Sequence, residues 1–195
     1  MNRTHLIPLT TFFSSVNLSG GCSSSILDQK LILSCGSYLA PTGENGLEIT
    51  SVENTPFDLR NTSENGKLLG EAVPLVNAGG PPGFDHCFLV DGYDTNYEQR
   101  QSGGKPPVHP VATLTHEFSG RQLQLSASMP AVQVYTANWL GARGDDTTNK
   151  FVQHNAIALY TQFYPDSPNQ PSFPSTILRP EETFTHSTIY SFRTV

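Results

Sequence analysis

Apolar and polar residues alternate along this chain in short runs, and no long helical stripe interrupts them. Residues 155–162 show the two-residue period of a β-strand. One face of this run carries Ile157, Leu159 and Thr161, and the other carries Ala156, Ala158, Tyr160 and Gln162. Further runs with strand character lie at 30–33, 47–52, 84–90, 111–116, 122–128, 131–136 and 183–192. The pattern predicts short strands separated by turns.

Glycine and proline support the same prediction. The chain has 16 glycines and 15 prolines, spread over its whole length. No window of roughly 12 residues keeps an apolar stripe of helical period free of them. We therefore expect an all-β protein without long helices.

The stretch that follows residue 162 is unusual in its proline content. Residues 165–174 hold four prolines, each of which fixes φ and lacks a backbone donor. This stretch is predicted to be a stiff surface loop. A strand that runs into such a loop is a natural place for a binding site.

Length and charge narrow the class of protein. The 195 residues suit one domain, 1–195, and the net charge of −6 comes without a basic stripe. Nucleic acid is therefore an unexpected partner. No apolar run approaches the roughly 20 residues of a membrane span, and the N-terminus lacks the features of a secretory leader. These features predict a cytoplasmic protein with no membrane partner.

The three cysteines are Cys22, Cys35 and Cys87. Their number is odd, and their spacing matches no zinc or redox motif. We expect reduced thiols that act as small buried apolar groups.

Several segments, in order along the chain, resemble the aldose 1-epimerase (galactose mutarotase) family. Residues 159–162 and 166–174 are similar to its Leu-Glu-Thr-Gln strand and its Asp-x-x-Asn-Gln-Pro-x-Phe-Pro loop. Residues 83–88 read Gly-Phe-Asp-His-Cys-Phe and resemble the family's Gly-Phe-Asp-His-Asn-Phe. Other landmarks match at 17–20, 26–28, 41–44, 55–60, 131–136 and 178–181.

The resemblance implies a fold and a reaction. The fold is the large antiparallel β-sandwich of the family, the galactose mutarotase-like supersandwich. The reaction interconverts the α and β anomers of a free hexose of the galactose or glucose class. A base removes the proton of the C1 hydroxyl while an acid protonates the ring oxygen, and the opened ring closes again on the other face. Neither a metal nor an organic cofactor is required.

Sugar-contacting residues follow from the resemblance. Asp85 occupies the position of the family's sugar-binding aspartate, and Gln133 that of a glutamine in the cleft. Alternation places Tyr135 on the same face as Gln133, and Gln162 ends the neighbouring strand. His86 matches a histidine beside the family's site. The alternative is a structural or solvent-facing role for each of these residues.

The two proton-transfer positions are substituted. Tyr160 stands where the family has its glutamate base, and a phenol with an ordinary pKa of about 10 is protonated at neutral pH. The acid position falls on Phe13 when counted back from Asn17, and on Ser14 when counted forward from Pro8. Neither residue is a histidine.

Comparison with the family also suggests that its N-terminal portion is absent, so the domain is incomplete. Loss of strands exposes a sheet edge, which a homo-oligomer or another partner would cover. Three functions follow as alternatives. The chain binds a monosaccharide with weak or lost epimerase activity, it is an active mutarotase that uses Tyr160, His86 or His154 for proton transfer, or it is a non-catalytic interaction domain.

Overall fold

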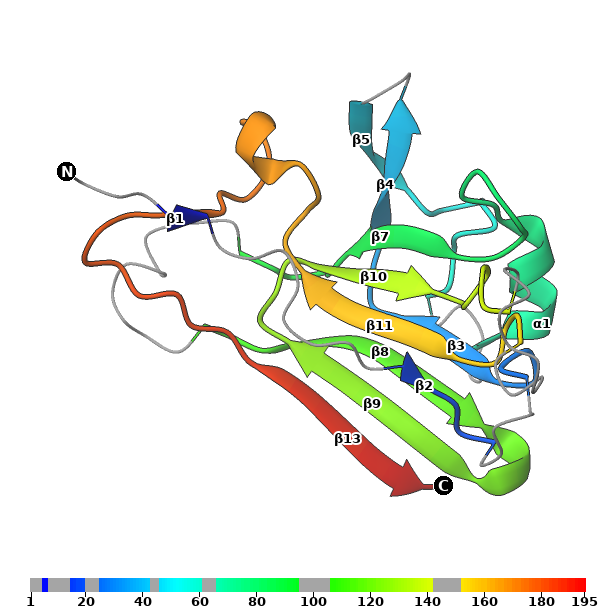
Figure 1. Cartoon of the computed structure of the whole chain (residues 1–195). Helices are drawn as coiled ribbons and strands as arrows, with labels where there is room; N and C mark the ends of the chain where they lie inside the picture. The colour runs from blue at the N-terminus through cyan, green and yellow to red at the C-terminus, as the bar shows by residue number, and fades with distance from the viewer. Residues whose placement is uncertain are drawn as a thin grey trace.

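The computed structural model describes residues 5–6, 15–19, 25–42, 46–60, 66–94, 106–141 and 152–195. Two antiparallel sheets stack to form a β-sandwich (Figure 1), which confirms the predicted fold class. The six-stranded sheet has the order β2-β11-β10-β7-β4-β5, and the five-stranded sheet has the order β13-β9-β8-β3-β6. A separate pair joins β1 to β12.

The strands of the six-stranded sheet are β2 (Ser15–Val16), β4 (Ser37–Thr42), β5 (Gly46–Ser51), β7 (Asp85–Leu89), β10 (Ala131–Tyr135) and β11 (Ile157–Gln162). Those of the five-stranded sheet are β3 (Lys30–Leu33), β6 (Lys67–Leu68), β8 (His109–His116), β9 (Arg121–Ala127) and β13 (Thr188–Thr194). The remaining elements are β1 (His5–Leu6), β12 (Ile177–Leu178), the helix α1 (Leu69–Ala72) and three 3₁₀ turns, η1 (Val73–Leu75), η2 (Glu117–Ser119) and η3 (Ser167–Asn169).

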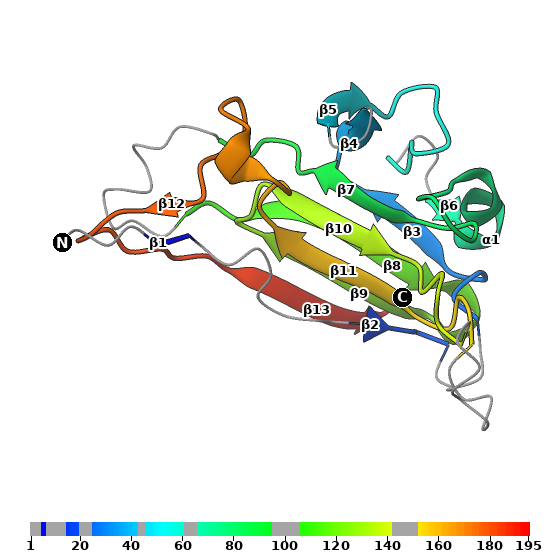
Figure 2. The same cartoon turned by 45° about the horizontal axis from the view of Figure 1, so that its top comes forward.

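The core lies between the inner faces of the two sheets, which overlie one another in Figure 2. Phe88 and Leu159 enter it from the six-stranded sheet, and Leu114 and Leu125 enter it from the five-stranded sheet. All four side chains are essentially buried. Removing an apolar side chain of this size from water contributes roughly 1.5–3 kcal/mol. The alternation in the sequence thus becomes one buried face on each sheet.

All eight predicted segments contain a strand, but β4 and the two-residue strands β1, β2, β6 and β12 were not predicted from the sequence. Pro41 lies within β4, and proline removes a donor from a sheet ladder. Here β4 pairs with β7 only at Ser37 and Tyr38, while Pro41 pairs with Leu47 of the β5 hairpin strand. Proline is tolerated because β7 no longer pairs with β4 at Pro41, so no hydrogen bond from β4 to β7 is lost there.

The last strand begins later than the prediction of 183–192. Pairing of β13 with β9 starts where Thr188 lies opposite Ala127. Before that point Phe184 leaves the sheet and packs against Phe163, with ring centroids 5.9 Å apart. Residues 183–187 therefore pack as an extended segment beside the sheet.

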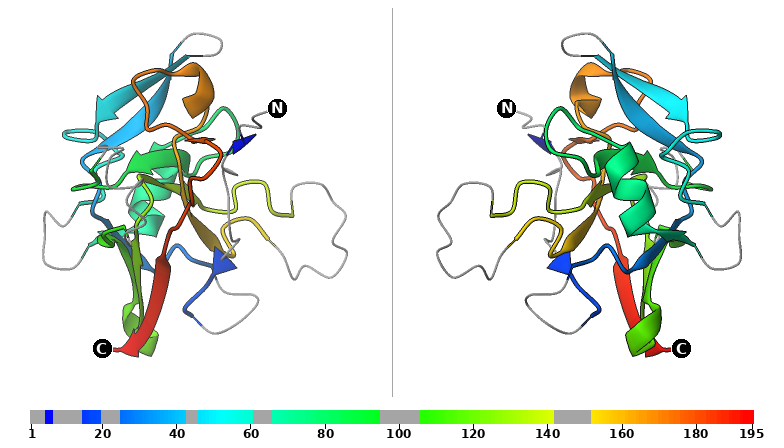
Figure 3. Two further views of the ribbon diagram at one scale, coloured as in Figure 1. Left: turned by 90° about the vertical axis from the view of Figure 1, so that its left-hand side faces the viewer. Right: turned by 90° about the vertical axis from the view of Figure 1, so that its right-hand side faces the viewer.

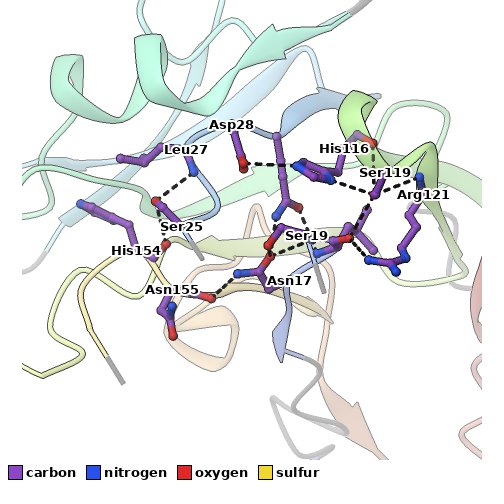
Figure 4. A network of polar contacts seen from close by, with 12 residues as sticks. Asn17, Ser19, Ser25, Leu27, Asp28, His116, Ser119, Arg121, His154 and Asn155 are labelled. Atoms are coloured by element: carbon purple, nitrogen blue, oxygen red, sulfur yellow. Dashed lines mark hydrogen bonds and ion pairs between the residues drawn. The ribbon is translucent and has the colours of Figure 1, made fainter. Parts of the chain in front are cut away.

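A polar network ties β2 to both sheets (Figure 4). The Asn17 amide donates to the carbonyl of Asn155 at 2.8 Å and accepts from the Gln29 amide at 2.7 Å. Arg121 donates to the carbonyl oxygen of Leu18 at 2.9 Å. These bonds hold the segment 15–19 between β11 and the β8–β9 turn.

Two surface features complete the fold. β13 is an edge strand, and its Ile189 and Phe192 are 48% and 66% exposed. Among the described residues, no helix has the length and apolar character needed to cross a membrane.

Candidate functional site

Five of the six residues that the sequence singled out come together on the outer face of the six-stranded sheet, the face turned away from the core. In the strand register Gln133 lies opposite Tyr160, and Tyr135 lies opposite Asp85. Gln162 lies opposite Ala131. Since opposed residues share a face, strands β7, β10 and β11 present these side chains together.

Asp85 and Gln133 form the polar centre of this face. The Gln133 amide nitrogen donates to Asp85 Oδ1 at 2.7 Å. Asp85 is exposed and Gln133 is half-buried. A carboxylate and an oriented amide side by side can accept from, and donate to, neighbouring hydroxyl groups.

Tyr160 stands beside this pair with its phenol protonated. Burial raises the pKa of Tyr160 above its ordinary value, and the nearby Tyr135 and the Asp85 carboxylate raise the pKa further. A hydrogen bond with Ser15 acts in the opposite direction. At neutral pH the phenol is thus a hydrogen-bond donor rather than a proton acceptor.

The proline-rich loop covers part of the outer face. Tyr164 and Phe173 pack over Cys87, Ala131 and Leu39, and Figure 3 shows this loop beside the β4–β5 hairpin. The pKa of Tyr164 rises to about 12 because the phenol is buried. The polar residues of the face therefore fall into a covered group and an open group.

Gln162 belongs to the covered group. Its side chain is only 4% exposed, and its amide nitrogen lies 3.8 Å from Cys87 Sγ. Asp85, Gln133, Tyr135 and Tyr160 form the open group.

The proline-rich loop is held together by side-chain hydrogen bonds within it. The Asp166 carboxylate accepts from the side chains of Asn169 and Gln170, and these bonds lower the pKa of Asp166. Asp166 itself has a positive φ of 61°, a conformation that aspartate tolerates better than most residues. Residues 163–174 thus border the open group on one side.

His86 lies on the inner face, away from the other predicted residues. It is opposite Val134 and is 7% exposed. Its ring packs against Phe57 with centroids 4.7 Å apart. Nδ1 accepts the backbone N–H of Asp85 at 3.1 Å, and burial lowers the pKa of His86. The geometry fits a neutral imidazole in the core.

His154 joins loops at one end of the sheet. Its Nδ1 lies 2.8 Å from the carbonyl oxygen of Thr136, and its own carbonyl accepts from the backbone of Ile26. Since a carbonyl oxygen only accepts, Nδ1 carries the proton. Phe13 and Ser14, the candidate acid positions, lie outside the described residues, as does Cys22.

Asp28, His116 and Ser119 form a hydrogen-bonded series at the β8–β9 turn (Figure 4). His116 Nε2 lies 3.2 Å from Asp28 Oδ2, and Nδ1 lies 2.7 Å from Ser119 Oγ. A carboxylate only accepts, so Nε2 donates to Asp28. Ser119 Oγ also lies 3.2 Å from the carbonyl oxygen of Leu18 and accepts the backbone N–H of Arg121. The series is a structural tie.

The sequence alone missed two residues of the site. Ser15 reaches the Tyr160 hydroxyl from β2, 145 positions away in the chain. Trp139 stands in the turn after β10, and its backbone N–H donates to the Tyr135 hydroxyl at 3.1 Å. A lone tryptophan next to a predicted site strand was the only sequence signal for either. Within the described ranges, no group of three or more His, Cys, Asp or Glu side chains is arranged to hold a metal ion.

Comparison with known proteins identifies the family of the chain. The family model for aldose 1-epimerase matches residues 11–191. The chain is 35% identical to the galactose mutarotase of Bos taurus over 189 residues, which are 93% of this chain and 48% of that protein. It is 30% identical to the aldose 1-epimerase of Escherichia coli strain K12, covering 90% of this chain and 48% of that protein.

A solved structure gives the same result at the level of the fold. The GalM/aldose epimerase homologue from C. elegans superposes with a TM-score of 0.69 at 23% identity, covering 94% of this chain and 50% of that one. The chain thus spans about half the length of the relatives it matches. Since the family model matches nearly all of the sequence, the chain belongs to the aldose 1-epimerase family.

Proposed function

We propose that this chain is a single sugar-binding domain that takes a free hexose of the galactose or glucose class on the open group of its outer face. Its aldose 1-epimerase activity is weak or lost, and it acts in the cytoplasm. The relatives are named galactose mutarotase and aldose 1-epimerase, and the site residues of this chain suit the same substrate class.

The hydrogen bond between Gln133 and Asp85 is the observation that carries the binding proposal. It orients an anionic acceptor next to an amide, and Tyr160 adds a donor on the adjoining strand. Vicinal hydroxyls of a pyranose need this mixture of acceptors and donors. Charged hydrogen bonds of this kind contribute roughly 1.5–3 kcal/mol each.

The environment of Tyr160 supports weak or lost turnover. Anomer exchange needs a group that accepts a proton near neutral pH, and the raised pKa of Tyr160 opposes that role. His86 would have to act from the far side of the sheet. His154 is bonded to a backbone carbonyl. An active site that uses one of these three residues is therefore the less supported alternative.

Polarimetry tests the proposal. Optical rotation of freshly dissolved α-D-galactose or α-D-glucose is followed with the chain, with buffer and with the Tyr160→Glu variant. We expect a decay close to that of buffer for the natural chain and a faster decay for Tyr160→Glu. Asp85→Ala in the Tyr160→Glu background is the matched control and should remove the gain. Strong acceleration by the natural chain would overturn the proposal of lost activity.

The edge strand β13 favours a second candidate, a non-catalytic interaction domain. Ile189 and Phe192 are exposed on β13, which pairs only with β9 among the strands that the structure describes. An edge of this kind can add a strand from a second copy or another chain. Light scattering over a range of concentrations tests the homo-oligomer, and Phe192→Lys should shift any oligomer to monomer. A monomer at high concentration would count against self-association.

A further inference from the structure

Trp139 is the single tryptophan of the chain, and it is 57% exposed. It lies in the turn that follows β10, four residues after Tyr135. An exposed indole is a large apolar surface in contact with water, and small-molecule sites combine aromatic side chains with a few oriented polar groups.

The turn that carries Trp139 is firmly held. Thr136 Oγ1 donates to Asn138 Oδ1 at 2.7 Å, and Asn138 donates to the carbonyl oxygen of Phe84 at 3.0 Å. Asn138 is buried, and Ala137 takes a positive φ of 53°. The hydrogen bonds make up for this unfavourable backbone conformation. These contacts therefore fix the backbone from which the indole of Trp139 projects.

The indole of Trp139 packs directly against the backbone of Gly80. A Cβ atom on Gly80 would lie 2.2 Å from a ring carbon of Trp139, so only glycine lets the ring lie on this backbone. The Asn77 side chain holds the loop by donating to the Gly80 carbonyl at 2.7 Å. The indole rests on Gly80 and remains more than half exposed.

Tyr135 connects the indole to the polar centre. Its hydroxyl accepts from the backbone N–H of Trp139 at 3.1 Å, and its backbone lies opposite Asp85. Tyr135 is therefore the cross-strand neighbour of Asp85 and is also hydrogen-bonded to the turn that carries the indole.

We propose that Trp139 is a carbohydrate-stacking residue that binds a second sugar ring, so that the site prefers a disaccharide or glycoside to a free hexose. This inference rests on the proposed sugar-binding function. The C–H groups on one face of a pyranose pack against the π-face of an aromatic ring. A prearranged platform gains affinity because little is ordered on binding.

Tryptophan fluorescence tests the inference directly, because all tryptophan emission comes from Trp139. The natural chain is titrated with galactose and with lactose, and affinities are measured in parallel by calorimetry. We expect lactose to shift the emission to shorter wavelength. Trp139→Ala should weaken lactose binding by about tenfold and galactose binding much less. Phe118→Ala is the matched control, since Phe118 is 97% exposed on η2, and it should change neither affinity.

The two ways of failing are distinct. If sugars bind by calorimetry, but lactose binds no better than galactose and Trp139→Ala changes nothing, the second-ring inference is overturned and sugar binding stands. If neither sugar gives measurable heat or a fluorescence change, both the second-ring inference and the proposed sugar-binding function are overturned. Trp139→Leu repeats the test with an apolar side chain of intermediate size, in case Trp139→Ala disturbs the turn.

Discussion

Gln133 donates a hydrogen bond of 2.7 Å to Asp85 although the two residues are not opposed in the sheet. Gln133 lies opposite Cys87, and Asp85 lies opposite Tyr135. The bond therefore runs diagonally between β10 and β7, and each side chain fixes the direction of the other. A neutral thiol at Cys87 leaves the amide free to turn toward the carboxylate.

The diagonal bond predicts that the two residues support sugar binding unequally. Asp85→Ala removes the charged acceptor and should abolish the rise in melting temperature that millimolar galactose produces. Gln133→Ala leaves the carboxylate in place but unoriented, and should weaken binding by roughly 10- to 100-fold, in line with a hydrogen bond to a charged group. Gln124→Ala, on the outer face of the other sheet, is the control. Equal and full binding by Asp85→Ala would contradict the site.

A second prediction concerns Tyr160. If the phenol only donates, Tyr160→Phe should leave any residual turnover in polarimetry within about twofold of the natural chain, while sugar affinity falls by about 5- to 10-fold through loss of one hydrogen bond. Loss of turnover with unchanged affinity would instead identify Tyr160 as the group that moves the proton.

Alternation in the sequence predicted eight of the strands and placed Gln133 and Tyr135 on one face, as the register of β10 has them. Asp85 and Tyr160 were assigned by resemblance to the family, and the strand register puts them on that same outer face. His86 was assigned to the site by resemblance, although its neighbour Asp85 already occupies the outer face and adjacent strand residues point to opposite sides.

Other features depend on packing between distant parts of the chain. The burial of Gln162 comes from the fold of the proline-rich loop over it. The hydrogen bond between Ser15 and Tyr160 comes from the pairing of β2 with β11. The position of Trp139 depends on the close approach of Gly80. No local pattern encodes these three relationships.

A third prediction follows from the buried His86. Burial lowers its pKa in the folded chain below the value of 6.5 that it has when unfolded. The unfolded chain therefore takes up a proton first as the pH falls. The free energy of unfolding is unaffected by this group above about pH 6.5 and declines as the pH drops from there through the lower pKa of the folded state.

Urea denaturation at pH 7.5, 6.0 and 5.0 measures this decline. His86→Phe places an apolar ring among Phe57 and Phe84 and should flatten the dependence between pH 6.5 and 5. His186→Phe is the control and should leave the pH dependence of the unfolding free energy unchanged. His186 stacks on Phe184 outside the core, with ring centroids 5.5 Å apart. An unchanged slope in His86→Phe would show that another group is responsible.

The last prediction uses the reactivity of Cys87 to test whether the proline-rich loop covers part of the outer face. Burial raises the pKa of the Cys87 thiol to about 12, and burial likewise raises the pKa of Cys35. In a Cys22→Ser, Cys35→Ala background only Cys87 remains. Its reaction with dithiodipyridine at pH 8 should be slower than that of a free thiol by on the order of a thousandfold, because the thiolate fraction is so small.

Tyr164→Ala together with Phe173→Ala removes the two rings that cover Cys87, and should speed the reaction well before the chain unfolds. If the double variant stays folded by circular dichroism and Cys87 stays as slow, the sheet rather than the loop buries it, and the division of the outer face into a covered and an open group is wrong.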